Sequence, residues 1–355
     1  MDQFKSDGRY KDDLNEYADL ILNRYGTASK TAEREILYLA ETGNTVAKNA
    51  YADLLFYKRI LRRDPFLDAF HMYLDAADIH IDEEGEWHCS GSSYPVAFWS
   101  IGLFLTNYRR HSFLKECEEV PEIEAMSLAK RLGMALRLAI ATSDYVESPG
   151  AINLVGRILY ESTLQEDVFE EMRGEIAETL TSRWEEIAAS SHSYRSKEDC
   201  IRGAEAFFRM AAAEGYVYAC NNLAIQEGEK IIQLKKKGAE PEEIEDHIQL
   251  YIDYLSRSAD KYEPYAANRL GMFYVEGEVK GTSETIQFRE HIIPSLAKEY
   301  FRKATVYPDE NSAWAFLNLI SHFHSDYTHN LELLDEHMGY IEQLNPEVYD
   351  IAMEI

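Results

Sequence analysis

Two short stretches of this 355-residue chain concentrate side chains that bind metal ions. The first, HIDEEGEWHC, carries His80, Asp82, Glu83, Glu84, His88 and Cys89. Imidazole, thiolate and carboxylate groups are ligands of zinc and calcium, but this spacing matches neither a zinc site nor the register of a calcium-binding loop. We therefore interpret the stretch as a solvated acidic loop in an insertion between two helices.

The second stretch, SHFHSDYTH, carries His322, His324, Asp326 and His329. It partly matches the H-x-H-x-D-H string of metallohydrolases, although two residues separate Asp326 from His329 and the context indicates the end of a helix. Histidines that can carry a positive charge are favourable near the last carbonyls of a helix. The sequence therefore predicts neither a metal site nor a cofactor.

The usual sequence signatures of enzymes are missing from the chain. It has no GxSxG nucleophile elbow, no GxxxxGK[ST] phosphate loop, no GxGxxG and no HExxH. Pairs of carboxylates arise by chance among 63 acidic residues, so a pair alone indicates nothing. We predict a protein without catalytic residues.

The chain carries a formal net charge of −27, from 63 acidic and 36 basic residues. This charge repels the phosphates of nucleic acids and anionic lipid surfaces, and it favours a basic partner, although acidic faces also keep a long helical protein in solution. No apolar run is long enough to span a membrane, and the start lacks an export signal. The widely spaced Cys89, Cys117, Cys200 and Cys220 indicate reduced thiols. These features predict a cytoplasmic protein that binds neither nucleic acids nor membranes.

The composition, with 46% hydrophobic residues, nine prolines and eighteen glycines, favours an all-α fold with a continuous core. Along the chain, an alanine is repeatedly followed four positions later by a larger residue and then by a small one. This pattern starts at Ala47, Ala97, Ala151, Ala219, Ala266 and Ala313. Positions i and i+4 share a helix face, so the small residues allow a paired helix to come close.

A second pattern lies between copies of the first, and it places an aromatic residue four positions after an alanine and an alanine three positions later. Its copies are Ala69, Tyr73 and Ala76, then Ala204, Phe208 and Ala211, then Ala297, Phe301 and Ala304. An aromatic ring on that face can fill the space between hairpins. Each repeat is therefore predicted to contain a first helix and a second helix.

Together the two patterns resemble the tetratricopeptide repeat, and the linkers LAETGNTVA and AAEGYVYA resemble its Sel-1-like variant. In these linkers Ala40 and Ala212 are followed three residues later by Gly43 and Gly215. Glycine suits that position because a helix end often needs a positive φ angle. The resemblance covers about residues 31–346. It implies an all-α fold, a right-handed α-solenoid of about seven antiparallel helix hairpins.

We expect one helical-repeat domain over residues 1–355, with a divergent N-terminal hairpin in 1–42, repeats in 43–346 and a C-terminal cap in 347–355. Terminal hairpins need such caps because their stacking faces would otherwise stay wet.

Two irregular elements are expected within the array. An inserted helix at about 166–190 is indicated by apolar residues at helical spacing, namely Val168, Met172, Ile176, Leu180, Trp184 and Ile187. The first helix that contains Ala219 is expected to run long, to Lys237, before Gly238 and Pro241 start the next helix.

The position two residues after the repeat alanine is the predicted binding position. It holds Asn49, Asn153, Asn221 and Asn268, while Trp99 and Ala315 occupy it in the other two repeats. The resemblance implies that the first helices line a concave groove and that this position points into it. An asparagine can donate to and accept from a peptide backbone at once, so a row of them would hold an extended chain. The adjacent candidates are Tyr218, Asn222, Tyr265 and Arg269. The alternative is that these asparagines satisfy neighbouring helix ends or face water.

We therefore expect a non-enzymatic adaptor or scaffold that binds a protein or peptide segment on its concave face, and the net charge favours a basic segment. Two alternatives remain open. One is an enzyme built on a helical toroid with an acidic pocket, and the other is a scaffold that associates with itself.

Overall fold

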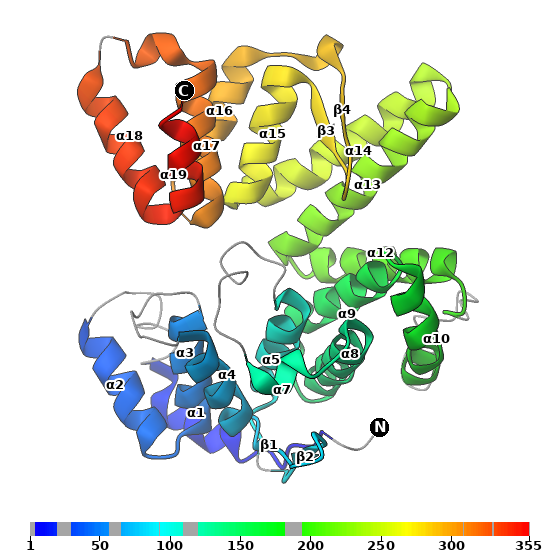
Figure 1. The fold of residues 1–355 in the computed structure, drawn as a ribbon, viewed down its shortest axis with the longest axis vertical. Coiled ribbons are helices and arrows are strands. Elements are labelled where there is room, and N and C mark those ends of the chain that lie inside the picture. The colour runs from blue at the N-terminus through cyan, green and yellow to red at the C-terminus, as the bar shows by residue number, and fades with distance from the viewer. Residues whose placement is uncertain are drawn as a thin grey trace. The chain divides into compact units, whose positions relative to one another are not determined.

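The computed structural model describes residues 4–19, 30–56, 65–91, 93–108, 120–181, 194–307, 309–328 and 330–354. Most of these residues are helical, as the composition predicts, and two short β-hairpins lie among the helices (Figure 1). The chain forms two compact units, Met1–Met210 and Ala211–Ile355, and each is described by itself. A single domain over the whole chain and a right-handed superhelix therefore stay predictions.

The N-terminal unit is a series of helices that pack against their neighbours along the chain. The helices are α1 (Tyr10–Asp19), α2 (Lys30–Glu41), α3 (Thr45–Phe56), α4 (Pro65–Ala76), α5 (Pro95–Asn107), α7 (Pro121–Glu124), α8 (Leu128–Tyr145), α9 (Pro149–Ser162), α10 (Glu166–Thr181) and α12 (Lys197–Ala213), which ends just beyond the boundary. Helix α3 packs against α4, α5 against α8, and α8 against α9.

The C-terminal unit contains three helix hairpins and a short cap. Its helices are α13 (Val217–Lys237), α14 (Pro241–Ala259), α15 (Pro264–Glu276), α16 (Pro294–Ala304), α17 (Glu310–His322), α18 (Leu331–Leu344) and α19 (Pro346–Ala352). Helix α13 pairs with α14, α15 with α16, and α17 with α18, while α15 also packs against α17. The first helices of this unit are therefore α13, α15 and α17, and the second helices are α14, α16 and α18. Short 3₁₀ turns cover Arg289–His291 and His324–Asp326.

Both expected irregular elements are confirmed. Helix α10 buries Val168, Met172, Ile176 and Leu180, whereas Trp184 and Ile187 lie outside the described residues. Helix α13 runs to Lys237 and ends at Gly238, whose φ of 68° is the left-handed conformation that glycine adopts readily. Helix α14 then starts at Pro241.

The helix hairpins depend on close contact between a first helix and the aromatic residue of a second helix. A Cβ added to Gly271 of α15 would lie 2.4 Å from the ring of Phe301 in α16, and one added to Gly156 of α9 would lie 2.7 Å from the ring of Phe208 in α12. Both rings are almost completely buried. The small residue of the first sequence pattern and the aromatic residue of the second therefore meet in space.

The linkers between hairpins have the geometry that the sequence predicts. Gly43 and Gly215 have φ angles of 104° and 83°. The amide of Gly43 donates to the carbonyl of Ala40 over 3.1 Å, and the amide of Gly215 donates to that of Ala212 over 3.0 Å. The three-residue spacing from alanine to glycine is thus the turn that ends a second helix.

The two β-hairpins are a departure from the prediction, which placed no strands in the chain. Strands β1 (Ile79–Ile81) and β2 (Trp87–Cys89) pair between α4 and α5, and strands β3 (Glu278–Lys280) and β4 (Thr285–Gln287) pair between α15 and α16. Each strand has only three residues, which is too short for a period-two pattern to stand out. Both hairpins are held by buried side chains, Trp87 in the first and Val279 in the second.

Replacing Gly271 by Ala is expected to lower the free energy of unfolding by about 1 to 3 kcal/mol, because the new methyl group overlaps the ring of Phe301. The same change at Gly174, in the middle of α10, meets no atom within 4 Å. There it is expected to raise stability by about 0.5 to 1 kcal/mol, since alanine favours a helix over glycine. Urea denaturation followed by circular dichroism measures both, and equal effects at the two positions would contradict the packing.

Candidate functional site on the first helices of the C-terminal unit

The first helices of the C-terminal unit each leave one line of side chains open to solvent. At about 100° per residue, positions i, i+3 or i+4 and i+7 lie on one face of a helix. The nine residues at this spacing are Tyr218, Asn222 and Ile225 of α13, Tyr265, Asn268 and Met272 of α15, and Trp314, Asn318 and Ser321 of α17. All nine are half-buried or exposed, and we call them the first-helix stripe.

The stripe repeats the same chemistry from one helix to the next. Its first position is aromatic in all three helices, as Tyr218, Tyr265 and Trp314, and its second position is always asparagine. Tyr218 is 52% exposed and Trp314 is 41% exposed. The third position holds Ile225, Met272 and Ser321. The three first helices therefore present an aromatic row beside an amide row.

A hydrogen bond joins two members of the amide row directly. The Nδ2 atom of Asn318 donates to Oδ1 of Asn268 over 2.9 Å. A side-chain amide has two N–H donors and an oxygen that accepts twice. This bond uses the oxygen of Asn268 and one N–H group of Asn318. Both N–H groups of Asn268 can therefore still donate to a partner, and Asn318 keeps one N–H donor and its oxygen.

A buried carboxyl group connects α13 to the start of α15. Glu263 precedes α15 and accepts hydrogen bonds from the backbone amides of Tyr265 (3.3 Å) and Ala266 (2.7 Å). Its Oε2 atom also accepts from Nδ2 of Asn221 over 2.9 Å. Burial raises the pKa of Glu263, while these three donors act in the opposite direction. The two first helices are thus tied together at their N-terminal ends.

The start of α17 carries a second carboxylate at the same end of the unit. The side chain of Asp309 caps α17 by accepting from the backbone amides of Asn311 (2.8 Å) and Ser312 (3.2 Å), in a capping box. Partial burial, followed by the charges of Glu263 and Asp309, raises the pKa of Tyr218. The N-terminal ends of α15 and α17 therefore each carry an acidic cap, and both caps lie near Tyr218.

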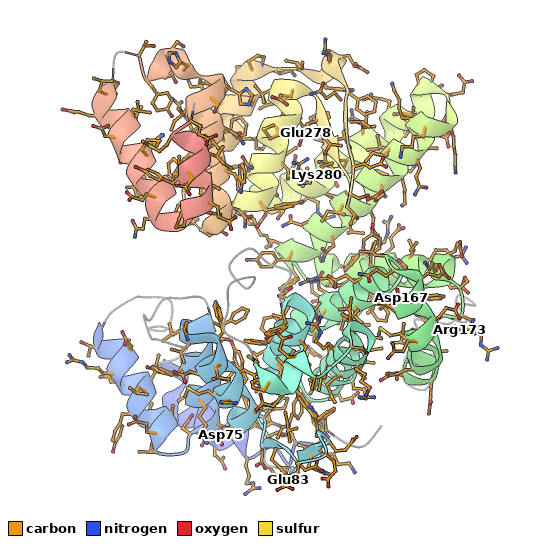
Figure 2. The ribbon with its side chains drawn as sticks, viewed as in Figure 1. Asp75, Glu83, Asp167, Arg173, Glu278 and Lys280 are labelled. Atoms are coloured by element: carbon orange, nitrogen blue, oxygen red, sulfur yellow. The ribbon has the colours of Figure 1, made fainter. Side chains whose placement is uncertain are left out.

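The hairpin of β3 and β4 packs against both α13 and α15 at the other end of these helices (Figure 1). Glu278, which Figure 2 labels on β3, pairs with Arg269 of α15 over 2.7 Å. The backbone of Lys280, also labelled in Figure 2, lies so close to α13 that a Cβ on Gly228 would be 2.4 Å from its carbonyl oxygen. The backbone amide of Thr282 donates to Glu229 of α13. The hairpin is thus fixed to both first helices.

The structure places most of the predicted asparagine row inside the protein. Asn49, Asn153 and Asn221 are 5%, 4% and 6% exposed, and Asn268 alone of the four is half-buried. Asn221 bonds to Glu263 at the end of the neighbouring first helix, which matches the alternative that these asparagines satisfy neighbouring helix ends. Arg269 is also buried and is paired with Glu278.

The remaining predicted residues divide between the two units. Tyr218, Asn222 and Tyr265 belong to the first-helix stripe, together with Asn268. Trp99 of α5 is half-buried in the N-terminal unit, where its ring lies 3.1 Å from the place of a Cβ on Gly150. This contact makes Trp99 a packing residue on at least one face of its ring.

Sequence reasoning missed five of the nine stripe residues because it used a fixed offset from the repeat alanine. Asn318 lies five residues after Ala313, whereas Asn268 lies two residues after Ala266 and Asn222 lies three after Ala219. Successive helices are rotated differently about their axes, so equal offsets do not give equal directions. A search for aromatic residues followed by asparagine after three or four positions in each first helix would have found the row.

The two metal-like stretches have other roles in the structure. In the first, His80 and His88 face each other across β1 and β2 with stacked rings, and His88 contacts Asp82 over 2.7 Å. In the second, His322 lies 3.7 Å from Glu276 and Asp326 pairs with Lys298, while His329 lies outside the described residues. In the part of the chain that the structure describes, no group of three or more His, Cys, Asp or Glu residues is arranged to hold a metal ion.

No family model matches the sequence, and no curated protein matches it. A solved Sel1 repeat protein from Oxalobacter formigenes is similar to this chain. The two are 12% identical, and the match covers 97% of this chain and 100% of that chain with a TM-score of 0.43. No described helix has both the length and the apolar character needed to cross a membrane.

Replacing Asn221 by Ala is expected to lower the free energy of unfolding by about 1.5 to 3 kcal/mol, because it removes a hydrogen bond to a buried carboxyl group. Asn15 is exposed on α1, and Asn15→Ala should change stability by less than about 0.5 kcal/mol. Urea denaturation at neutral pH measures both. Similar stabilities of the two variants would show that the bond to Glu263 contributes little.

The raised pKa of Glu263 predicts a dependence of stability on pH. The folded protein retains this proton at pH values where the unfolded chain has released it, so the contribution of Glu263 to stability falls as pH rises from its ordinary pKa of 4.5 through its folded pKa. Glu263→Gln removes this titration. The stability of the parent relative to the variant should therefore decrease between pH 4.5 and 7.5 in urea denaturation, and a difference that grows with pH would contradict the assignment.

Proposed function

We propose that the chain is a non-enzymatic module that binds a protein or peptide segment on the first-helix stripe of its C-terminal unit. The observation that carries this proposal is the repetition of an aromatic residue and an asparagine along α13, α15 and α17, with Tyr218 and Trp314 exposed and Tyr265 half-buried. Tyr218 and Trp314 expose 52% and 41% of their surfaces, in a protein that buries most of its large aromatic side chains. Large exposed aromatic residues beside polar groups are characteristic of binding surfaces.

The amides support a binding role because they differ from the buried asparagines of the same helices. The side-chain amide of Asn221 donates a hydrogen bond to the buried Glu263. Asn268 and Asn318 are instead half-buried and bond to each other at the surface. A hydrogen bond between two half-buried amides contributes little to folding, because water can compete for it. It can also offer donors and acceptors to a bound main chain.

The buried acids of the C-terminal unit have structural partners. Glu227 accepts from Lys230 over 2.8 Å and contacts His247 over 2.6 Å, and Glu263 caps α15. Acids used in this way tie helices together, and this supports the non-enzymatic proposal over a toroid with an acidic pocket.

The test is to select ligands from a library of random linear decapeptides against the full chain, and to measure the affinity of selected peptides for variants. Replacing both Tyr218 and Trp314 by Ala is expected to weaken binding by about 30-fold or more, which corresponds to one aromatic hot spot of about 2 kcal/mol. Tyr38→Ala is the matched control, since Tyr38 is 66% exposed on α2.

Two results would overturn the proposal. One is a selection that yields no peptide bound by the parent more tightly than by the Tyr218 and Trp314 variant. The other is an equal loss of affinity in the Tyr38 variant, which would place the binding surface elsewhere. Thermal melts of all variants confirm that the comparison is made between folded proteins.

A further inference from the structure

The helices that carry the first-helix stripe contain almost no basic residues near it. Helix α17 contains no lysine or arginine, and neither does α13 from Val217 to Glu229. Helix α15 contains Arg269 alone, which is 8% exposed and pairs with Glu278 over 2.7 Å. Within these three stretches, the helices therefore bring no cationic side chain of their own to the stripe.

Carboxylates lie at both ends of the stripe. At the N-terminal end, Glu263 and Asp309 cap α15 and α17. At the other end, Glu229 and Glu276 stand four residues after Ile225 and Met272, on the same helix faces, and both are half-buried. The imidazole of His322 lies 3.7 Å from Glu276, and Glu229 accepts a hydrogen bond from the backbone amide of Thr282. A ligand with positive charge would therefore meet Asp309 at one end and Glu229 and Glu276 at the other, whereas Glu263 is buried.

The aromatic row adds a second preference for cations. The face of an aromatic ring attracts Lys and Arg side chains. The same unit shows this contact near its linkers, where Nζ of Lys303 lies 5.9 Å from the ring centre of Tyr262 and 5.6 Å from that of Tyr300 while it bonds to Asp260 over 2.7 Å. Tyr218 is exposed and feels the charge of Asp309, so it offers the same combination of ring and carboxylate to a partner, and Trp314 offers a second exposed ring.

The amide row indicates the conformation of the bound segment. Asn222, Asn268 and Asn318 stand on three successive first helices, so a chain that contacts all three must run across the helix axes. An extended main chain exposes its N–H and C=O groups, whereas a helix uses them internally. Side-chain amides can pair with exposed groups of both kinds.

We propose that the occupant of the first-helix stripe is an extended basic peptide segment, whose main chain bonds to Asn222, Asn268 and Asn318 and whose Lys or Arg side chains reach the aromatic row and the carboxylates at the ends. This inference rests on the proposed function and specifies the chemistry of the partner.

The experiment uses an array of random linear decapeptides probed with the labelled full chain and with variants of equal or nearly equal charge. Asn268→Ala combined with Asn318→Ala keeps the net charge, so peptides that bind the parent but not this variant are separated from those attracted by the overall charge of −27. We expect these peptides to be enriched in Lys and Arg. If the double variant lacks a cooperative melt, Asn318→Ala alone takes its place.

Two further measurements on the best peptide test its charge and its main chain. Replacing Glu229 and Glu276 by Gln should weaken binding about fivefold, as expected for two ion pairs formed at the protein surface. Replacing Glu243 and Asp246 of α14 by Gln and Asn changes the charge equally on an exposed helix face and should leave affinity within about twofold. Methylating alternate main-chain nitrogens of the peptide should weaken binding about tenfold, because it removes donors to the amide row.

The outcomes distinguish this inference from the proposed function. Peptides that depend on the amide row but are not enriched in Lys and Arg, or that tolerate main-chain methylation, would overturn the basic, extended partner and leave peptide binding intact. An array in which no peptide distinguishes the parent from the Asn268 and Asn318 variant, or from the Tyr218 and Trp314 variant, would overturn both.

Discussion

The close approach of an aromatic ring to a glycine is the contact on which the rest of this structure depends. Phe301 lies against Gly271, and Phe208 against Gly156, at distances that leave no room for a Cβ atom. A missing side chain on the first helix thus lets the ring of the second helix fill the space between them, and the buried alanines around it keep the backbones near each other. Because this contact faces the second helix, it leaves another face of each first helix free for a different use.

Packing of the buried faces fixes which side chains of a first helix are left on its outer face. Asn221 and Asn222 are adjacent in the chain, yet they point about 100° apart, so one bonds to the buried Glu263 and the other lies on the surface. Glu263 has two structural roles, since it caps α15 and also accepts a hydrogen bond from Asn221 of α13. In α13, therefore, one asparagine holds the neighbouring helix and the next lies on the half-buried outer face.

The β3–β4 hairpin shapes this unit in a way that a plain array of helices would not. It packs against α13 and α15 and brings Glu278 to Arg269. Burial by itself lowers the pKa of Arg269, but Tyr251, Tyr265 and Glu278 outweigh it, so the net shift is upward and the guanidinium stays charged. Pairing of this kind offsets the cost of burying a charge, and it removes the single cation of α15 from the surface. The hairpin thereby leaves the first-helix stripe without a cationic side chain from α15.

The helical hairpins could be predicted from the sequence, because the spacing of alanine, glycine and aromatic residues indicates which residues meet within a pair, as Gly271 and Phe301 do. The linker turns at Gly43 and Gly215 and the long α13 could also be predicted, since they follow from local backbone preferences. The direction in which each asparagine points could be read only from the packed helices. That direction depends on how each first helix is rotated about its axis against its neighbours. A rotation of α13 by about 100°, which is one residue, would place Asn221 where Asn222 now lies. The short β-hairpins could not be predicted from the sequence either, because three-residue strands are stabilised by the helices they contact and have no sequence pattern of their own.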